Sequence, residues 1–468
     1  MMKEVYLTID FGSTYTKLTA IDLKEETILA TAKAITTVES DVMIGFEEAF
    51  NKLKQDISEK IDLSNVKFVR KTACSSAAGG LKMMALGLVP ELTADAAKKA
   101  ALGAGARVIK TYAYELNHHE LEEIKKSNVD IILLAGGTDG GNKECIIHNA
   151  KLIAEYELKV PVIMAGNKSA VDEVEELFKA KNIYYKVTEN VMPVLNKLNV
   201  EPAREAIRQV FMEKIVEAKG MKKAEEFTTG ILMPTPAAVL KAAEVLSKGT
   251  DLEDGIGDLI IIDIGGATTD VHSIAKGEPT KPGVILKGLE EPVSKRTVEG
   301  DLGMRYSAIA LLEASSTKKV KTYLRDEYKG LDIRKHCEKR HDNIKMVPET
   351  AEDKAFDEAM AMVATELAME RHCGILECLY TPMGTMFHQV GKDLLDTPCV
   401  IGTGGVIVHS ENPNNILKAG NFNQENPVHL KPVNPKFLVD KTYILSAMGL
   451  LAQDYPDLAV RVMKKYLV

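Results

Sequence analysis

The strongest signal of the fold is the segment Ile9-Asp10-Phe11-Gly12-Ser13-Thr14-Tyr15-Thr16-Lys17-Leu18. An alternating strand ends in the carboxylate of Asp10, and a turn of glycine and hydroxyl residues follows before the chain returns as a second strand. Such a turn exposes backbone N–H groups and hydroxyls to an anion, and Lys17 lies near enough to assist. The segment therefore predicts a cradle for phosphate oxygens, with an ordinary β-hairpin as the alternative.

A second segment, near the middle of the chain, has the same chemistry: Asp263-Ile264-Gly265-Gly266-Ala267-Thr268-Thr269-Asp270-Val271. It places a carboxylate before two glycines that let a ligand approach the backbone, and two threonine hydroxyls follow. Two such strand–turn units facing each other would bind a triphosphate from both sides. Asp10 and Asp263 would then hold Mg²⁺ mainly through water, because this ion gives up its hydration shell reluctantly.

A third glycine segment, Gly402-Thr403-Gly404-Gly405-Val406, follows a strand near the end of the chain, and it lets the backbone lie against a flat adenosine. In this order the three segments resemble the phosphate-1, phosphate-2 and adenosine motifs of the actin, sugar-kinase and DnaK-type chaperone ATPase superfamily. Glu299-Gly300-Asp301-Leu302-Gly303-Met304 resembles that superfamily's Gly-Asp-x-x-Leu-Gly turn, where a helix begins beside the nucleotide. Ala267 departs from the usual third glycine of phosphate-2, so we expect a slightly looser approach of the backbone to the phosphate there.

The resemblance implies a set of site residues. Asp10, Asp263 and Lys17 are the expected catalytic residues; Asp10 and Asp263 are also the residues expected to hold Mg²⁺, and Asp263 is the better candidate for orienting the attacking water. The residues expected to bind ATP or ADP are Gly12, Ser13 and Thr14 on the first phosphate side, Gly265, Gly266, Thr268 and Thr269 on the second, Glu299, Asp301 and Gly303 in the following turn, and Gly402, Gly404 and Gly405 behind the adenosine.

Length and composition are those of a large globular protein. The chain has 468 residues, of which 45% are hydrophobic and 27% charged, enough for about three folding units or one two-lobed enzyme. A net charge of −8 argues against nucleic acid as the main partner. The first residues enter a strand without the apolar stretch of a secretory signal, and no apolar run reaches the length of a membrane span. Six cysteines without close pairs are typical of free thiols, so we expect a cytoplasmic protein.

The order of apolar runs predicts an α/β protein with repeated lobes. Short β-branched runs end in glycine-rich turns and alternate with helical patterns. We expect a two-lobed actin-like ATPase with ribonuclease H-like lobes. The N-terminal lobe would span residues 1–250 with an inserted α/β segment at about 120–225, and the C-terminal lobe 255–468 with a helical insertion at about 315–372. The polar, glycine-rich residues 248–257 indicate the boundary.

Within the superfamily, the chain resembles the MutL/GlmL-type proteins encoded beside adenosylcobalamin-dependent glutamate mutase and related aminomutases. This resemblance covers essentially the whole chain. The segments that carry it are residues 9–17, Cys74-Ser-Ser-Ala-Ala-Gly-Gly-Leu81, Leu134-Ala-Gly-Gly-Thr-Asp-Gly-Gly-Asn142, residues 263–270 and residues 299–304. It implies an ATP-hydrolysing, chaperone-like reactivating factor that binds the mutase and promotes release of damaged cobalamin. ATP held between the lobes would keep them closed, and hydrolysis would release them.

Other functions on the same fold stay open. A small-molecule kinase would need a carboxylate base against a bound substrate, for which the sequence shows no segment. An ATPase activator coupled to electron transfer through an iron–sulfur cluster would need a cysteine arrangement that Cys373 and Cys378 do not match. A nucleotide-sensing scaffold would bind ATP and ADP without turnover. The identity of the mutase, the need for a small second subunit and the oligomeric state are also open.

Two further features have two interpretations each, and a third is rejected as a ligand site. The turn at residues 136–142 is either a ligand-binding turn or a tight connection that needs positive φ angles. The basic segment 318–345 is either a solvated insertion or a docking surface for an acidic partner, in which case Lys335, Lys339 and Arg340 would contribute. His272 lies in a sequence that partly matches a cobalamin-ligand motif, but it lacks the motif's glycine and belongs to phosphate-2, so we reject it as a cobalt ligand.

Overall fold

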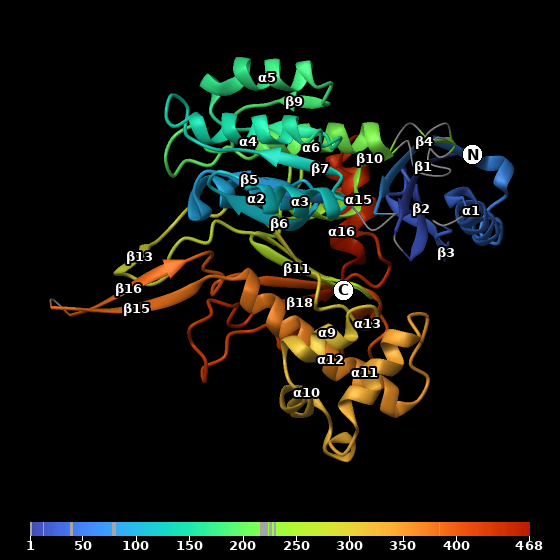
Figure 1. The fold of residues 1–468 in the computed structure, drawn as a ribbon. Helices are drawn as coiled ribbons and strands as arrows, with labels where there is room; N and C mark the ends of the chain where they lie inside the picture. The colour runs from blue at the N-terminus through green and yellow to red at the C-terminus, as the bar shows by residue number, and fades with distance from the viewer. Residues whose placement is uncertain are drawn as a thin grey trace. The chain divides into compact units, whose positions relative to one another are not determined.

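The structure is a computed structural model that describes residues 2–12, 14–37, 41–76, 81–215, 223, 227–228, 231–382 and 384–468 (Figure 1). The chain divides into two compact units, as the predicted two-lobed α/β fold requires. Unit 1 comprises Met1–Ala242, Gly288–Pro292 and Ile444–Val462, and unit 2 comprises Ala243–Lys287, Val293–Tyr443 and Met463–Val468. The units are therefore not two continuous halves of the chain.

The main sheet of unit 1 has five strands in the order β10-β4-β1-β2-β3. Its strands are β1 (Lys3–Phe11), β2 (Tyr15–Asp22), β3 (Thr27–Ile35), β4 (Val66–Ser75) and β10 (Ile231–Pro234). The first three strands are antiparallel neighbours, while β4 and β10 extend the sheet beyond β1 as parallel strands. Leu7 and Ile9 of β1 share a core with Phe46 and Leu53 of α1 (Val42–Ser58).

The main sheet of unit 2 repeats this topology. Its strands are β11 (Leu259–Ile264), β12 (Thr269–Ile274), β14 (Ser294–Glu299), β17 (Cys399–Thr403) and β18 (Lys436–Val439). The order β14-β12-β11-β17-β18 has the same antiparallel and parallel neighbours as the sheet of unit 1. A duplicated sheet explains why similar strand-end sequences recur along the chain and confirms the predicted actin-like fold.

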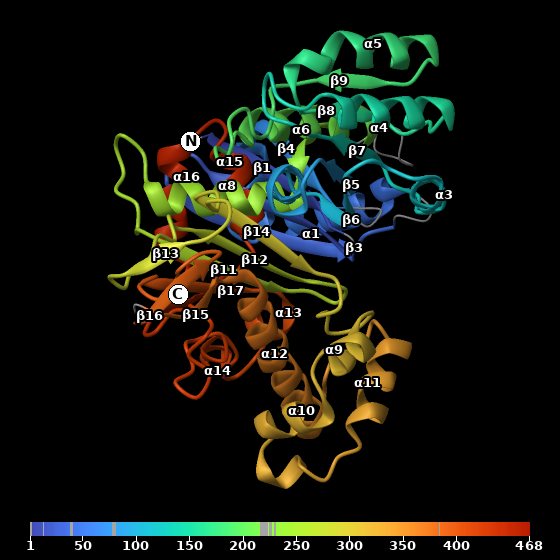
Figure 2. The ribbon, with the colours of Figure 1, turned by 60° about the vertical axis from the view of Figure 1, so that its left-hand side comes forward.

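Unit 1 carries an inserted parallel sheet between β4 and β10, in the order β6-β5-β7-β8-β9 (Figure 2). Its elements are β5 (Lys82–Gly87), α2 (Asp95–Gly103), β6 (Arg107–Ala113), α3 (His118–Lys126), β7 (Ile131–Leu134), α4 (Glu144–Glu155), β8 (Val162–Met164), α5 (Val171–Ala180), β9 (Tyr185–Val187) and α6 (Glu201–Ile215). Apolar side chains on one face of the sheet pack with α3, α4 and α5, and those on the other face pack with α2 and α6. Helices on both faces explain the continuous apolar runs of these strands.

Unit 2 carries a helical insertion and a separate three-stranded sheet. Its helices are α9 (Ala308–Ala314), α10 (Thr317–Tyr323), α11 (Ile333–Asp342), α12 (Ala351–His372), α13 (Gly405–Val408) and α14 (Pro413–Lys418). The small sheet consists of β13 (Val284–Leu286), β16 (Gly384–Val390) and β15 (Ile375–Thr381), in that order. Phe356 and Met360 of α12 lie in the core that the helices share with the main sheet. Figure 2 shows α9, α10 and α11 gathered beside α12.

Three further α-helices are described. They are α8 (Thr235–Lys248), α15 (Leu445–Leu451) and α16 (Pro456–Tyr466). Single turns of 3-10 helix occur at Leu63–Asn65, Lys168–Ala170 and Asp326–Tyr328, and a π-helical turn occurs at Pro90–Ala94. Among the described residues, no helix combines the length and apolar character that crossing a membrane requires.

A substitution at Gly449 of α15 tests how closely this helix packs on α8 in unit 1. A Cβ atom added to Gly449 would lie 1.8 Å from the carbonyl oxygen of Ala238. Gly449→Ala should therefore lower the free energy of unfolding by about 2–3 kcal/mol, in the range of overpacked cores. The measurement is urea denaturation, with Gly330→Ala as the control because Gly330 has no atom within 4 Å of an added Cβ. A loss no larger than in the control would contradict this close packing.

Candidate functional site

The carboxylate of Asp10 is held by side chains from three other elements. Asp10 lies at the carboxyl end of β1 and is 7% exposed. Its Oδ1 atom accepts hydrogen bonds from Thr235 Oγ1 at 2.6 Å and Cys74 Sγ at 3.5 Å. Its Oδ2 atom accepts one from Ser446 Oγ at 3.1 Å. Because these donors come from α8, β4 and α15, the orientation of the carboxylate depends on packing within unit 1.

Sequence reasoning missed all three of these donors as partners of Asp10. Thr235 had a visible signal, because it lies between Pro234 and Pro236 at the start of a helix. Cys74 lies beside Asp10 only through the parallel pairing of β4 with β1. Burial, reinforced by the nearby carboxylate, raises the pKa of the Cys74 thiol well above its usual range, so the thiol stays protonated and donates to Asp10.

The phosphate-1 turn joins β1 to β2. Asp10 pairs directly with Lys17 across these strands, and opposite residues of an antiparallel pair project from the same face. The half-buried Lys17 is therefore on the face of the catalytic candidate Asp10. A Cβ atom on Gly12 would lie 2.6 Å from the carbonyl oxygen of Tyr15, which explains the need for glycine. Thr14 is exposed in the turn, and Ser13 lies outside the described residues.

The phosphate-2 turn at residues 265–268 joins β11 to β12, and all four of its carbonyl oxygens accept hydrogen bonds. Three of the donors come from residues 304–307, at the end of the predicted turn at residues 299–304, which we call the acidic turn. The bonds are Met304 N to Gly265 O at 3.0 Å, Arg305 N to Gly266 O at 2.8 Å, Ser307 Oγ to Ala267 O at 2.7 Å and Gly265 N to Thr268 O at 2.9 Å.

The backbone N–H groups of residues 266–268 in the phosphate-2 turn point in the opposite direction to the turn's carbonyl groups that face residues 304–307. In a trans peptide the N–H group points opposite to the preceding C=O group, and the chain contains no cis peptide among its described residues. The amides of Gly266, Ala267 and Thr268 therefore point away from residues 304–307, and within the described part of the chain they donate no hydrogen bond. Gly266 and Ala267 are exposed. Consecutive free amides of this kind form a site for an anion.

The departure of Ala267 from glycine carries no backbone strain, because its φ angle lies outside the left-handed region. Gly303, in contrast, must be glycine. A Cβ atom at Gly303 would lie 2.3 Å from the carbonyl carbon of Ala267. The acidic turn thus lies directly against the phosphate-2 turn.

Several predicted binding residues have their polar groups engaged within the protein. Glu299 and Asp301 both accept hydrogen bonds from Arg371 of α12, at 2.7 Å each. These bonds hold the pKa of the Asp301 carboxyl below its usual value. Thr269 is buried and donates to the carbonyl oxygen of Leu302 at 2.6 Å. Contacts of Glu299, Asp301 and Thr269 with a nucleotide stay a prediction, and their observed role is to hold the acidic turn.

Asp263 occupies the position in unit 2 that Asp10 occupies in unit 1. Each is the last residue but one of the first strand of its sheet. Asp263 is half-buried and pairs with Asp270 on β12 and with Thr403 on β17. The charge of Asp270 is balanced by Arg296, which donates to it at 2.6 and 2.9 Å, and Thr268 Oγ1 donates to the same carboxylate at 3.0 Å.

The predicted adenosine segment adjoins the phosphate-2 hairpin. Gly404 has a φ of 94°, and a Cβ atom there would lie 2.3 Å from the carbonyl oxygen of Ile264. Gly405 is exposed, with the hydroxyl of Tyr443 at 3.9 Å from an added Cβ. Gly402 is buried against Ile407 and Leu417, so its observed role is packing.

The turn at residues 136–142 connects β7 to α4 in the inserted sheet. Gly136, Gly137 and Gly140 have φ angles of 145°, 69° and 75°, as the interpretation of a tight connection expects. The buried amide of Asn167 accepts from Gly140 N at 3.1 Å and donates to the carbonyl oxygens of residues 141 and 142. The turn is therefore held rigid from within the inserted sheet.

The docking interpretation of segment 318–345 is wrong for Arg340. Arg340 is fully buried and binds Asp357 of α12 at 2.6 Å. Lys339 and Lys335 are both exposed, and Lys339 also binds Asp353 at 3.0 Å. Much of the positive charge of the segment is neutralised by α12, since Lys319 binds Glu366 and Arg325 approaches Glu358 in addition.

Two buried histidines lie at the β11–β12 hairpin, one within it and one packed against it. His272 on β12 is 1% exposed, so it cannot serve as a cobalt ligand for a cofactor outside the core. Burial and the nearby Arg296 guanidinium lower its pKa to about 3. His372 of α12 bridges Thr297 Oγ1 and Ser273 Oγ, each at 2.8 Å, and burial holds its pKa well below the usual value.

Comparisons with known proteins extend over the whole chain. The model of the family described as MutL protein matches residues 6–467. Protein MutL of Clostridium tetanomorphum is 67% identical over 465 residues, covering 99% of each chain. Among solved structures, a gluconate kinase of Lactobacillus acidophilus matches 100% of this chain and 92% of its own, at 12% identity and a TM-score of 0.34. A glycerol dehydratase reactivase matches 96% of this chain and 99% of its own, at 10% identity and a TM-score of 0.32.

The buried histidines make folding stability depend on pH. Because the folded pKa of His272 is lowered, its stabilising effect is complete above the unfolded value near 6.5 and is lost as pH falls toward 3. Between pH 7 and pH 5 the free energy of unfolding should fall by about 2 kcal/mol because of His272, and the lowered pKa of His372 acts in the same direction. Urea denaturation of His272→Gln should show a smaller fall, by about 2 kcal/mol, than the unchanged protein. An equal fall in both proteins would contradict a neutral, buried His272.

Proposed function

The chain belongs to the MutL protein family, and on that premise we propose that it is an ATP-hydrolysing, chaperone-like reactivating factor for an adenosylcobalamin-dependent mutase. Glutamate mutase or a related aminomutase is the proposed partner, and release of damaged cobalamin is the proposed result. The partner and the process rest on the resemblance of the sequence to proteins encoded beside such mutases. The nucleotide part rests on the site itself.

One observation supports the proposal that the chain binds a nucleotide. Two copies of the same sheet end their first strand in the same way, with Asp10 in one and Asp263 in the other, each followed by a glycine turn. In unit 2 this turn presents three consecutive amides, at residues 266–268, whose opposing carbonyls are all engaged. Free amides beside a carboxylate suit a phosphate group and the hydrated cation that accompanies it.

Each proposed site residue has a distinct task. The amides of residues 266–268 would bind phosphate oxygens, and Lys17 would balance phosphate charge. Asp10 and Asp263 would hold Mg²⁺ mainly through water, and the ion when bound would neutralise charge on the phosphates. Asp263 would also orient the attacking water. The hydroxyls of Thr235 and Ser446 fix the carboxylate of Asp10, so they act as positioning groups.

We also propose a cytoplasmic location. All six cysteines are free thiols, and five of them are buried. Burial raises the pKa of Cys337 and of Cys373 to about 12, so both thiols are unreactive at neutral pH. Such a set of cysteines suits a reducing compartment.

The two aspartates should be essential for hydrolysis. Asp10→Asn and Asp263→Asn keep the shape of each side chain but remove its charge, so each should lower kcat for ATP hydrolysis by about 100-fold or more. Asp22→Asn is the matched control, because Asp22 is a fully buried carboxylate at the far end of the β1–β2 hairpin, paired with Lys3. Turnover is measured as phosphate release with Mg-ATP. Wild-type turnover in either variant would remove the proposed role of that aspartate.

The reactivating role has its own test. An aminomutase inactivated by loss of the adenosyl group is mixed with this protein, Mg-ATP and fresh adenosylcobalamin, and mutase activity is followed. Restoration should require ATP, because the proposed process depends on hydrolysis. A non-hydrolysable ATP analogue serves as the control. Equal restoration with the analogue would refute the role of hydrolysis, and no restoration with several mutases would favour a small-molecule kinase.

A further inference from the structure

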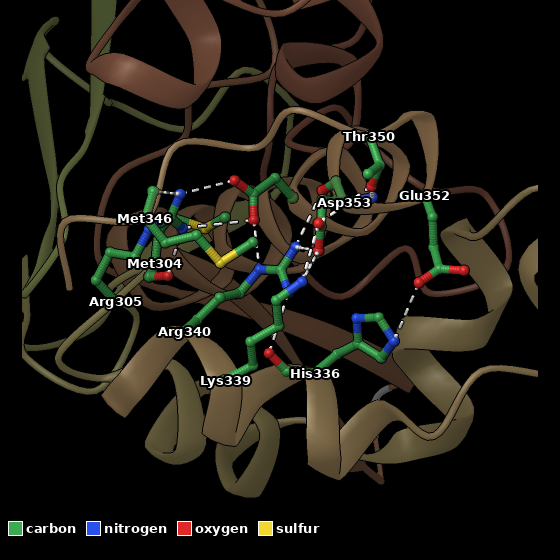
Figure 3. A network of polar contacts seen from close by, with 10 residues as sticks. Met304, Arg305, His336, Lys339, Arg340, Met346, Thr350, Glu352 and Asp353 are labelled. Atoms are coloured by element: carbon green, nitrogen blue, oxygen red, sulfur yellow. Dashed lines mark hydrogen bonds and ion pairs between the residues drawn. The ribbon is translucent and has the colours of Figure 1, made fainter. Parts of the chain in front are cut away.

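Arg305 links the phosphate-2 turn to the helical insertion of unit 2, residues 315–372. Its backbone N–H group donates to the carbonyl oxygen of Gly266, within the turn, at 2.8 Å. Its side chain extends in another direction, toward α12 and the connection between α11 and α12 (Figure 3). One residue therefore contacts the proposed phosphate site with its backbone and the insertion with its guanidinium.

All five N–H groups of the Arg305 guanidinium have acceptors. Nη2 donates to Asp357 Oδ2 at 2.8 Å, and Nη1 approaches Oδ1 of the same carboxylate at 3.4 Å. The carbonyl oxygen of Met346 accepts from both Nε and Nη2, at 3.2 and 3.1 Å. Nη1 also donates to the carbonyl oxygen of Met304 at 2.8 Å. The connection at residues 343–350 is thus anchored on Arg305 through Met346.

Asp357 also connects Arg305 to α11, because it binds Arg340 of that helix. Its Oδ1 atom accepts from Nε of the fully buried Arg340 at 2.6 Å. Arg340 in turn donates to the backbone oxygens of Asp353 and His336, each at 3.0 Å, and its guanidinium lies 4.4 Å from the ring of Phe356. Figure 3 shows Arg305 and Arg340 converging with their acceptors into one network of polar contacts.

The network resists gradual deformation. Asp357 is the shared acceptor of two arginines, and its side chain is 6% exposed. Removing either charge from such a buried pair leaves the other uncompensated, which is strongly unfavourable. A displacement of Arg305 therefore has to be followed by Asp357 and Arg340, because solvent cannot replace their bonds. Packed networks of this kind change between discrete arrangements.

We propose that Arg305 and Asp357 are positioning residues that couple occupancy of the phosphate-2 turn to the helical insertion. This inference rests on the proposed nucleotide binding and adds the route by which the bound phosphate is sensed. Phosphate on the amides of residues 266–268 fixes the peptides whose carbonyl oxygens hold Arg305 N and Met304 N. The guanidinium of Arg305 then sets the position of residues 343–350 and of α11. The surface formed by these two segments therefore differs between nucleotide states.

Hydrogen exchange of the unchanged protein tests the inference first. Exchange is compared without nucleotide, with Mg-ADP and with a non-hydrolysable Mg-ATP analogue. The analogue should slow exchange at residues 265–268, and it should change exchange at residues 343–350 and in α11 by about threefold or more relative to ADP. Protection of the turn with no change in the insertion would overturn the coupling and leave the proposed function intact. No protection of the turn by any nucleotide would overturn both.

A matched pair of variants then assigns the coupling to this network. Asp357→Asn removes the shared acceptor charge, whereas Glu366→Gln removes an equally buried carboxylate of α12 that binds Lys319 and Tyr323 of α10. Asp357→Asn should lose most of the nucleotide-dependent change in residues 343–350, and Glu366→Gln should keep it. A full response in Asp357→Asn would overturn the proposal. If Asp357→Asn does not fold, Arg305→Lys, which keeps the charge but loses the paired donors, replaces it with the same expected result.

Discussion

The candidate site in unit 2 depends on four accepted hydrogen bonds, because the carbonyl oxygens of residues 265–268 are all bound within the protein. Three of them accept hydrogen bonds from residues 304–307, and the fourth closes the turn. Because each peptide is planar and trans, the amides that follow these carbonyls must face the other way. The anion site that we propose at these amides thus depends on hydrogen bonds made on the opposite side of the turn. Gly303 makes this arrangement feasible, since no other residue fits against Ala267.

The two main sheets have one topology but differ around their key aspartates. Across the hairpin, Asp10 faces Lys17, whereas Asp263 faces Asp270, whose charge is neutralised by Arg296. On the parallel side, Asp10 is beside Cys74 and Asp263 is beside Thr403. The same backbone position therefore has a cationic neighbour in unit 1 and a balanced acid in unit 2.

The helical insertion shows why net charge along a sequence is a poor guide to a surface. A count of charges along the sequence indicates a basic surface for a partner, but α12 supplies carboxylates for several of these basic residues. Arg340, fully buried, belongs to the core of the insertion. Seven of the ten basic residues of segment 318–345 are exposed, but pairing with α12 offsets part of their charge, and the packing of α11 on α12 also provides the link to the phosphate-2 turn.

Local signals in the sequence determined the α/β class, the repeated strand–turn segments, the acidic turn with Gly303 and the family. They did so because strand alternation and the need for glycine at close turns depend on a few neighbouring residues. The partners of Asp10 could not be found in this way, since Thr235 and Ser446 lie 225 and 436 positions away from it. Only the tertiary structure brought Arg371 to Asp301, buried Arg340, and showed which carbonyls of the phosphate-2 turn are engaged. Those outcomes depend on how distant elements pack, which no local pattern of residues encodes.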